Sequence, residues 1–219
     1  MVETSLHEAI IRWYSKPNDL LEAKIEGYLV DIVRGRLLIE IQTGSFSSIK
    51  AKLLNLIPNH RVRLIHPVAV RKWILRIDRS GKELSRRRSP RRGRLEDVFL
   101  ELVYIPTLMK EPNFSLEILL VHTEEVLINN SLGSWRRRGW SVHDRRFLEV
   151  IGTEVFENPR DFLRLLPESL PSSFTTRDLV EASGLRTNIA QKMIYSLRHM
   201  GVIEAVGKQG RASLYSTVY

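Results

Sequence analysis

The chain has 219 residues, of which 43% are hydrophobic and 27% charged, a composition typical of a folded globular protein rather than a disordered one. It contains no cysteine, which excludes disulfides, thiolate zinc sites and cysteine nucleophiles, and its formal net charge of +9 makes a polyanion the first partner to consider. No apolar run approaches the roughly 20 residues of a membrane span, and the N-terminus lacks a secretory signal pattern, so we expect a cytoplasmic protein without a membrane partner.

The first predicted element is a helix over residues 3–16, because apolar side chains such as Leu6 and Ile10 recur at helical spacing and Pro17 stops the pattern. Glu8 lies between the apolar positions of this helix. The side chain of Glu8 either faces the following strands as an additional acid or is exposed in the first helical turn, which is the commoner case for a glutamate.

Residues 26–42 are predicted to form a β-hairpin, because two runs rich in leucine and β-branched residues meet at a dipeptide that contains glycine. With Arg34 and Gly35 as a two-residue loop, Asp31 lies opposite Leu38. Directly opposed residues of an antiparallel pair share a face of the sheet. The face on which each polar side chain of the hairpin lies therefore follows from its position along the strand.

Three polar side chains, Asp31, Glu40 and Gln42, share one face of this hairpin. Two carboxylates that converge in a buried place repel each other and lose hydration, so they need a neutralising partner. A divalent cation is one such partner. Ion pairs with basic side chains such as Lys24 or Arg63 are the purely structural alternative.

The hairpin is followed by a predicted short helix, with Ser47 or Ser48 as its cap and Pro58 as its end. Lys50 lies in the first turn of this helix and is close in sequence to the strand that carries Glu40. Lys52 follows within its first two turns, and of the two lysines Lys50 is the nearer to the strand in sequence.

Residues 79–94 change the composition sharply, with eight basic residues against the single Glu83. Because such a segment cannot form a packed core, we expect a mobile loop insertion or an extended arm. Contact with phosphates is favoured, since charges this dense repel unless an anion is present. A solvated insertion without a function is the alternative. The candidate phosphate contacts are Arg86, Arg87, Arg88, Arg91 and Arg92.

Several further elements are predicted on either side of this insertion. The expected elements are two strands, or one strand broken by Pro67, over residues 61–78, an amphipathic helix over 95–109, a strand or strand pair over 114–128, a strand over 144–157 and a helical stretch over 160–166. A second basic and aromatic cluster, at residues 135–146, suits contact with phosphates and stacking on an unpaired base, and equally a packed hairpin tip. Its candidate contacts are Arg136, Arg137 and Arg138.

The last part of the chain, from residue 172, predicts a compact helical module. Thr175 or Thr176 caps a first helix, Gly184 lies in the turn, and a second helix covers residues 186–201. Two short strands then flank the basic sequence KQGR at 208–211. The order of these elements is helix, turn, helix and hairpin.

This segment resembles a winged helix-turn-helix domain through the sequence TTRDLVEASGL, the helix RTNIAQKMIYSLRHMGVI and the basic GKQGR of the predicted wing. The resemblance implies that the start of the second helix enters a DNA groove and that the wing contacts backbone phosphates. A winged helix used for protein contact or dimerisation is the alternative. The residues implied for nucleic-acid contact are Arg186, Thr187, Asn188, Gln191, Lys192, Lys208 and Arg211.

Residues 3–75 resemble the PD-(D/E)XK nuclease superfamily, which includes restriction endonucleases and archaeal-type Holliday-junction resolvases. The resemblance rests on the order of elements: a helix with Glu8, a strand with Asp31, a strand with Glu40 and Gln42, then a helix and further strands. It implies an α/β (α+β mixed) fold class with a central mixed β-sheet flanked by helices, as in restriction endonucleases.

The two resemblances together divide the chain into a nuclease-like domain over residues 1–165 and a small winged-helix domain over 166–219. They imply a metal-dependent DNA endonuclease that is targeted by its C-terminal domain and acts on structured or branched DNA. RNA is the alternative polymer, and resolvase-like members of the superfamily often form homodimers.

The site implied by the nuclease resemblance holds Mg²⁺ or Mn²⁺ through Asp31, Glu40 and Glu8. Gln42 stands where the superfamily usually has a lysine, and its amide can orient a water but supplies no positive charge. Either Lys50 has taken over that charge, or the chain is a non-catalytic DNA-binding protein or transcriptional regulator on a degenerate nuclease scaffold.

Overall fold

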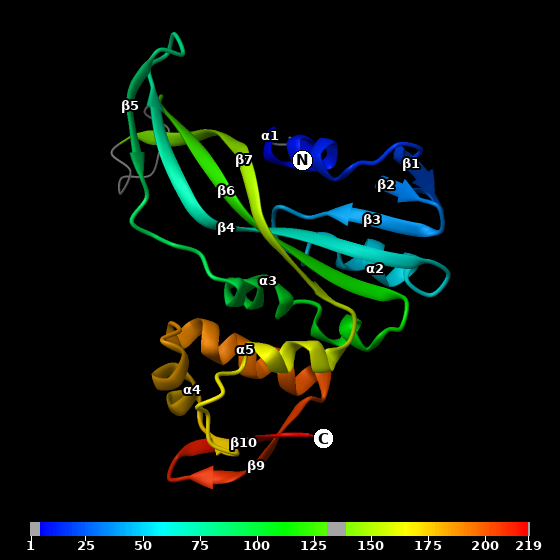
Figure 1. Cartoon of the computed structure of the whole chain (residues 1–219), viewed down its shortest axis with the longest axis vertical. Helices are drawn as coiled ribbons and strands as arrows, with labels where there is room; N and C mark the ends of the chain where they lie inside the picture. Colours follow the sequence, from blue (N-terminus) through cyan, green and yellow to red (C-terminus); the bar gives the residue numbers. More distant parts are fainter. Residues whose placement is uncertain (1–4, 131–138, 219) are drawn as a thin grey trace.

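The computed structural model describes residues 5–130 and 139–218 of the chain. It is a mixed α/β structure in which a large curved sheet carries helices on its faces and a smaller sheet with two helices adjoins it (Figure 1). The predicted α/β class, with a central mixed sheet and flanking helices, is therefore confirmed.

The helices of the described ranges are α1 (Ser5–Tyr14), α2 (Lys50–Leu56), α3 (Phe99–Leu102), α4 (Thr176–Ser183) and α5 (Thr187–Met200), with 3₁₀ helices η1 (Leu95–Val98), η2 (Pro106–Lys110) and η4 (Pro159–Leu165). The large sheet contains β1 (Leu20–Ile25), β2 (Tyr28–Arg34), β3 (Leu37–Ile41), β4 (Arg61–Ile77), β5 (Glu83–Arg88), β6 (Phe114–Asn129) and β7 (Trp140–Phe156). The small sheet contains β8 (Ser173–Phe174), β9 (Ile203–Gln209) and β10 (Ala212–Thr217). None of the described helices is long and apolar enough to cross a membrane.

The large sheet has the strand order β1-β2-β3-β4-β6-β7, and β5 pairs with the far end of β4. The first three strands form an antiparallel meander, after which α2 crosses over and β4 joins β3 in parallel. β6 pairs in parallel with β4 and antiparallel with β7. The sheet is mixed because the crossover through α2 returns the chain to the end of the sheet at which β3 began, so that β4 runs in the same direction as β3.

The β2–β3 hairpin forms as predicted, but its loop lies one residue later. Pairing continues as far as Arg34, so the loop residues are Gly35 and Arg36. Gly35 has a φ of +59°, the left-handed conformation that glycine adopts at the first loop position of a type II′ turn. The predicted pairing of Asp31 with Leu38 is therefore wrong. A loop moved by one residue shifts every pair by two, which keeps the predicted faces within the paired part of the hairpin. Val30 and Ile32 nevertheless belong to different cores, beside α2 and α1 respectively, so β2 is irregular next to Asp31.

β4 is one continuous strand, and Pro67 does not break it. Pairing with β3 ends at Ile65, whose carbonyl accepts a hydrogen bond from the backbone N–H of Gln42. The nitrogen of Pro67 points toward the same side two residues later, where β3 has already ended, so no ladder hydrogen bond is lost. A shift of the pairing with β6 between Ala69 and Arg71 marks an irregularity in β4 beyond the proline.

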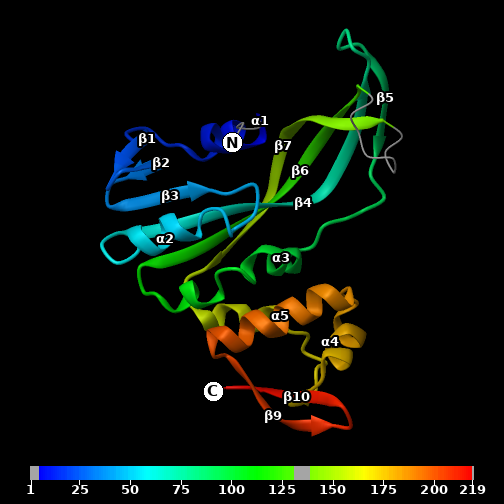
Figure 2. The same ribbon diagram turned by 180° about the vertical axis from the view of Figure 1, so that it is seen from behind.

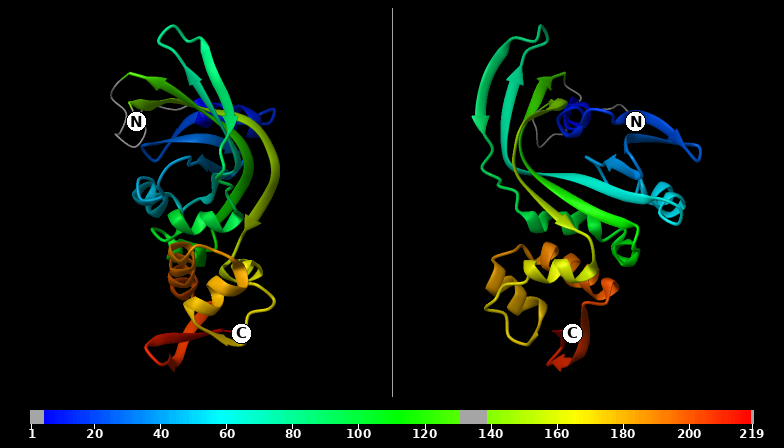
Figure 3. Two further views of the ribbon diagram at one scale, coloured as in Figure 1. Left: turned by 90° about the vertical axis from the view of Figure 1, so that its left-hand side faces the viewer. Right: turned by 45° about the vertical axis from the view of Figure 1, so that its right-hand side comes forward.

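The basic segment 79–94 is an extended arm rather than a loop throughout. Its residues Glu83–Arg88 form β5, which pairs antiparallel with the end of β4. All six residues of β5 are exposed. β5 thus adds a strand at one edge of β4, which on its other edge pairs with β6 as far as Ile77 (Figure 3).

The predicted helix over residues 95–109 is broken into η1, α3 and η2. Its apolar face is real, because Phe99, Leu102 and Met109 are buried. Pro106 begins η2 and cannot donate the backbone hydrogen bond that would continue α3. The amphipathic pattern therefore predicted the buried side chains correctly but not the continuity of the helix.

One hydrophobic core connects the large sheet with the C-terminal module. Phe99 of α3, Phe162 of η4 and Leu197 of α5 all belong to it, and α5 lies along α3 and η2 (Figure 2). α1 covers the opposite face of the sheet, above Ile32 and Ile39. The predicted domain boundary at residues 165 and 166 thus lies between two parts that share a core.

The C-terminal helices and hairpin form as predicted. Thr175 caps α4 in a capping box with Asp178, and Gly184 ends the helix with a φ of +65°. Gly201 ends α5 in the same left-handed conformation. β8 adds a third strand, so the small sheet has the order β8-β10-β9.

Gly93 lies where the basic arm returns across β4, and a Cβ atom at this position would lie 2.3 Å from the carbonyl oxygen of Ala69. We expect Gly93→Ala to lower the free energy of unfolding by about 1–3 kcal/mol, because backbone must shift to relieve the contact. Gly207, whose Cβ would meet nothing within 4 Å, provides the matched control. Gly207→Ala should change stability by no more than about 0.5 kcal/mol in the same urea titration. Equal effects of the two substitutions would contradict the close approach.

Candidate functional site

The two predicted acids lie at the end of the β2–β3 hairpin that is remote from its loop. Backbone pairing of the two strands ends at Ile32 and Ile39, and Asp31 and Glu40 are the next opposed residues. The Oδ2 atom of Asp31 accepts a hydrogen bond of 2.7 Å from the backbone N–H of Ile41. The carboxylate takes the place of a strand carbonyl as acceptor, so the regular ladder ends at the two acids.

Helix α1 brings a histidine, and not the predicted glutamate, to these acids. His7 Nε2 lies 3.3 Å from Asp31 Oδ2, and both side chains are largely shielded from solvent. Glu8 is exposed. The sequence contains the signal for this, because His7 lies four residues before the buried Ile11 and shares its stripe, whereas Glu8 is turned by about 100°. Within residues 5–130 and 139–218 no group of three potential metal ligands is formed by histidine and carboxylate side chains.

Glu40 is the most deeply buried member of the site, with 2% of its surface exposed, and its Oε1 lies 2.5 Å from Nζ of Lys52. Lys52 comes from α2 and also donates to the backbone carbonyl of Leu29. Burial raises the pKa of Glu40 to about 7, and the charge of Asp31 adds to the rise. Lys52 and the backbone N–H of Asp31 oppose it. One ammonium group therefore does not fully compensate the two carboxylates.

The lysine that reaches the acids is Lys52, two residues after the predicted Lys50. Lys50 is exposed at the first residue of α2. Two residues turn a helix by about 200°, so the two side chains leave it on different sides. The cap of α2 is Ile49 and not a serine, since the Ser48 hydroxyl bonds within the preceding loop. Arg63, the structural alternative as a counter-ion, pairs with a glutamate of β6 instead.

Gln42 turns away from the acids. Its Nε2 atom donates to the Ser45 carbonyl at 2.8 Å and to the Ser48 hydroxyl at 3.0 Å. The backbone carbonyl oxygen of Gln42 lies 2.6 Å from Nδ1 of His66. This ring nitrogen must therefore carry the proton and donate the hydrogen bond. Burial lowers the pKa of His66, so the ring is held neutral. Gln42 therefore fixes the loop after β3 and does not orient a water at the carboxylates.

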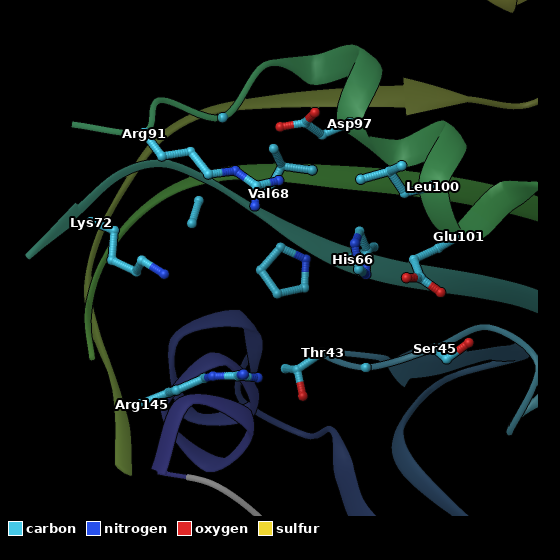
Figure 4. Close-up of a pocket in the computed structure, with 14 residues that line it drawn as sticks. Thr43, Ser45, His66, Val68, Lys72, Arg91, Asp97, Leu100, Glu101 and Arg145 are labelled. Atoms are coloured by element: carbon cyan, nitrogen blue, oxygen red, sulfur yellow. The ribbon is translucent and has the colours of Figure 1, made fainter. Parts of the chain in front are cut away.

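A pocket of about 390 Å³ opens beside this loop, along the stretch of β4 that β3 leaves uncovered (Figure 4). Lys72, Arg91 and Arg145 approach it from β4, the basic arm and β7. Asp97 and Glu101 approach it from η1 and α3. The residues that line the pocket include neither of the two acids of the hairpin.

The predicted phosphate contacts of the basic arm are only partly available. Arg86 lies 2.7 Å from Glu124, and the guanidinium groups of Arg86 and Arg88 lie 5.6 and 5.7 Å from the ring centre of Trp73. The exposed arginines without such a contact are Arg87, Arg91 and Arg92. The predicted contacts Arg136, Arg137 and Arg138 lie outside the described residues.

Some of the predicted nucleic-acid contacts of the C-terminal module are exposed, and others are bonded to other parts of the protein. The available ones are Thr187, Asn188 and Gln191 at the start of α5 and Lys208 and Arg211 at the β9–β10 turn, all of which are exposed. Arg186 lies 3.4 Å from Asp97 of η1. Lys192 was expected at the exposed start of the helix, but its ammonium donates to the Leu100 carbonyl at 3.1 Å and joins α5 to α3.

The chain has relatives among known sequences. Residues 4–157 match the family described as a domain of unknown function, DUF8091, and the chain belongs to this family. The chain is also similar to an uncharacterized protein of Treponema pallidum (strain Nichols), with 29% identity over 215 residues that make up 97% of this chain and 84% of that protein. No solved structure is significantly similar to the chain.

The raised pKa of Glu40 predicts a specific dependence of stability on pH. The unfolded chain releases this proton near the ordinary glutamate pKa of about 4.3, whereas the folded chain holds it up to about 7. The stabilising contribution is therefore complete below the lower value and is lost as the pH rises to the higher one. Glu40→Gln removes this titration.

We expect the free energy of unfolding of the wild type, minus that of Glu40→Gln, to fall by roughly 1–3 kcal/mol between about pH 4 and pH 7.5. Urea denaturation at a series of pH values measures the difference. Glu8→Gln, at an exposed glutamate of the same part of the chain, is the matched control. A difference between wild type and Glu40→Gln that does not change with pH would contradict the assignment.

Proposed function

We propose that the chain is a metal-dependent DNA endonuclease whose chemistry uses Asp31, Glu40 and Lys52. The observation that carries the proposal is the meeting of two carboxylates and one ammonium group at the end of the β2–β3 hairpin, with Lys52 2.5 Å from Glu40. Hydrolysis of a phosphodiester needs groups of both kinds. Acids hold a divalent cation, and a positive side chain stabilises the charge that develops on the phosphate.

The order of elements supports the resemblance to PD-(D/E)XK nucleases. α1 precedes the meander of β1, β2 and β3, α2 crosses over, and β4 lies parallel to β3. Asp31 is on the second strand and Glu40 on the third. In that superfamily a lysine usually follows the second acid at the position of Gln42, and here an ammonium group from α2 reaches the same acid.

Asp31 and Glu40 fit a hard cation such as Mg²⁺ or Mn²⁺, because both offer carboxylate oxygens. The pKa of Glu40 stays raised, to about 7, although Lys52 lies beside it, so further positive charge would stabilise the ionised pair. A bound cation would supply an activated water and neutralise charge on the phosphate. The side chains of His7 and Lys52 hold the two carboxylates in place from α1 and α2.

The C-terminal module supports DNA as the polymer. Its helices and its three-stranded sheet follow the order of a winged helix-turn-helix domain, with Lys208 and Arg211 at the turn of the hairpin. α5 packs along α3 and η2, which leaves Thr187, Asn188 and Gln191 as its exposed predicted contacts. The turn of the hairpin and the basic arm would then make most of the phosphate contacts.

Cleavage assays with plasmid, linear duplex and branched DNA test the proposal. We expect cleavage with Mg²⁺ or Mn²⁺, and a loss of at least about 100-fold in Asp31→Asn and in Glu40→Gln. Lys52→Met should lose about as much, whereas Lys50→Met, at an exposed lysine of the same helix, should cleave at the wild-type rate. Cleavage that survives the combined Asp31→Asn and Glu40→Gln changes excludes these acids as the site. Equal rates in the two lysine variants remove Lys52 from the mechanism.

A non-catalytic DNA-binding protein is the second candidate. The ion pair between Glu40 and Lys52 favours it, because it neutralises one acid without a metal. So does the lack of a third metal ligand among the described side chains. Salt-sensitive DNA binding without cleavage by any of the metals and substrates above would decide for this candidate.

Removal of the two basic side chains at the β9–β10 turn, with Lys208→Ala and Arg211→Ala combined, should weaken DNA binding for all sequences. The slope of log affinity against log salt concentration should become shallower by about 2, because two phosphate contacts are lost. Lys192→Ala is the comparison, since its ammonium bonds the Leu100 carbonyl. It should lower the melting temperature and leave the salt slope largely unchanged. An unaltered slope in the first variant would exclude this turn from the DNA interface.

A further inference from the structure

The pocket of about 390 Å³ beside β4 has walls of opposite charge. Figure 4 shows Lys72, Arg91 and Arg145 at one side of it and Asp97 and Glu101 at the other. The lining between the two sides is largely apolar, with Pro67, Val68 and Leu100. A ligand that fills this pocket would therefore be anionic at one end and would present hydrogen-bond donors at the other.

The two arginines supply the available positive charge. Lys72 is paired with Glu125, at 2.6 Å. The guanidinium groups of Arg91 and Arg145 have no acidic partner among the residues that the structure describes, and both side chains are exposed toward solvent. They come from the basic arm and from β7, which are far apart in the sequence. Two guanidinium groups placed in this way suit a phosphate group.

The two acids keep acceptor capacity toward the pocket. Glu101 accepts one hydrogen bond, from the Phe46 backbone N–H at 3.3 Å. Asp97 accepts from the Arg94 backbone N–H at 3.2 Å and lies beside the Arg186 guanidinium. An ionised carboxylate offers about four lone-pair sites, so each acid can accept further donors.

The size of the pocket suits one nucleotide unit. Its volume of about 390 Å³ lies at the lower end of the range of roughly 300–1,000 Å³ that is typical of small-molecule sites. Thr43 and Ser45, in the loop that follows β3, form part of the lining. A ligand in the pocket would lie next to the end of the strand that carries Glu40.

We propose that this pocket binds a single unpaired nucleotide, with its phosphate against Arg91 and Arg145 and its base on the apolar lining, toward Asp97 and Glu101. Adenine, cytosine and guanine carry an exocyclic amino group that donates hydrogen bonds, and thymine and uracil carry none. The pocket therefore prefers amino-bearing bases. The inference rests on the proposed function, because the nucleotide would belong to a DNA substrate with unpaired residues; a free nucleotide is the other source of the same chemistry.

The full chain in EDTA, with Asp31→Asn and Glu40→Gln combined to prevent cleavage, is titrated with dAMP, dCMP and dTMP by calorimetry. Binding of a hairpin duplex with one unpaired adenine is compared with binding of the fully paired duplex by fluorescence anisotropy. We expect a tenfold preference in at least one of the two experiments. Either dAMP and dCMP bind about tenfold more tightly than dTMP, or the duplex with the unpaired adenine binds about tenfold more tightly than the fully paired duplex.

Substitutions assign this preference to the pocket. Arg145→Ala and Arg91→Ala should each weaken the preferred probe by about tenfold, because a charge-assisted hydrogen bond is lost. Glu101→Gln should reduce the preference for amino-bearing bases, and Arg160→Ala, at an exposed arginine outside the pocket, should change nothing.

The outcome also separates the two sources. Preference for the unpaired adenine alone indicates a polymer site, and tight binding of dAMP indicates a site that takes free nucleotides as well. Binding of every probe that is indifferent to Arg91, Arg145 and Glu101, or no discrimination among the probes, overturns the proposal. That result would leave untouched a cleavage activity that depends on Asp31 and Glu40, and an inactive protein with a base-selective pocket would overturn only the proposed function.

Discussion

The charge imbalance between two opposed carboxylates is the constraint on which the arrangement of the hairpin and its helices depends. Glu40 is buried next to Asp31 where the β2–β3 ladder ends, and its pKa stays raised to about 7 with Lys52 only 2.5 Å away. His7 reaches the pair from α1 and Lys52 from α2, and these helices cover opposite faces of the sheet. The incomplete neutralisation costs stability at neutral pH, and a further cation beside the pair would remove this cost. In the proposed nuclease, stability and function would therefore be opposed at this site.

The unequal lengths of β3 and β4 create the second feature of the molecule. β3 ends opposite Ile65, whereas β4 continues to Ile77, so one edge of β4 is uncovered from Pro67 until β5 joins it. The nucleotide-sized pocket lies along this uncovered edge. The basic arm returns across it at Gly93, where backbone meets backbone so closely that only glycine fits. The same arm continues into η1 and α3, on which α5 is packed. The elements that follow the basic arm thus share one core with the C-terminal module.

The sequence allowed the hairpin, and the strand that carries each acid, to be predicted, because two apolar runs around a glycine are a local signal. It did not allow their partners to be predicted. On α1 and α2 the residue that reaches the acids differs from the predicted one only in its direction around the helix axis. Which direction faces the sheet depends on where each helix begins and how it packs. The predicted break at Pro67 was wrong for a related reason. A proline interrupts a strand only where a neighbouring strand needs its backbone hydrogen bond, and the local sequence does not tell where β3 ends. The capped helices and left-handed glycines of the C-terminal module were predictable because their signals are local.

The most direct test of the proposed metal site is the binding of Mn²⁺ to the full chain, followed by electron paramagnetic resonance in the absence of nucleic acid. We expect a saturable site in the wild-type protein that is weakened at least about tenfold when Asp31→Asn and Glu40→Gln are combined. Lys50→Met should bind Mn²⁺ as the wild type does. Wild-type affinity for Mn²⁺ in the protein that lacks both carboxylates would contradict the account.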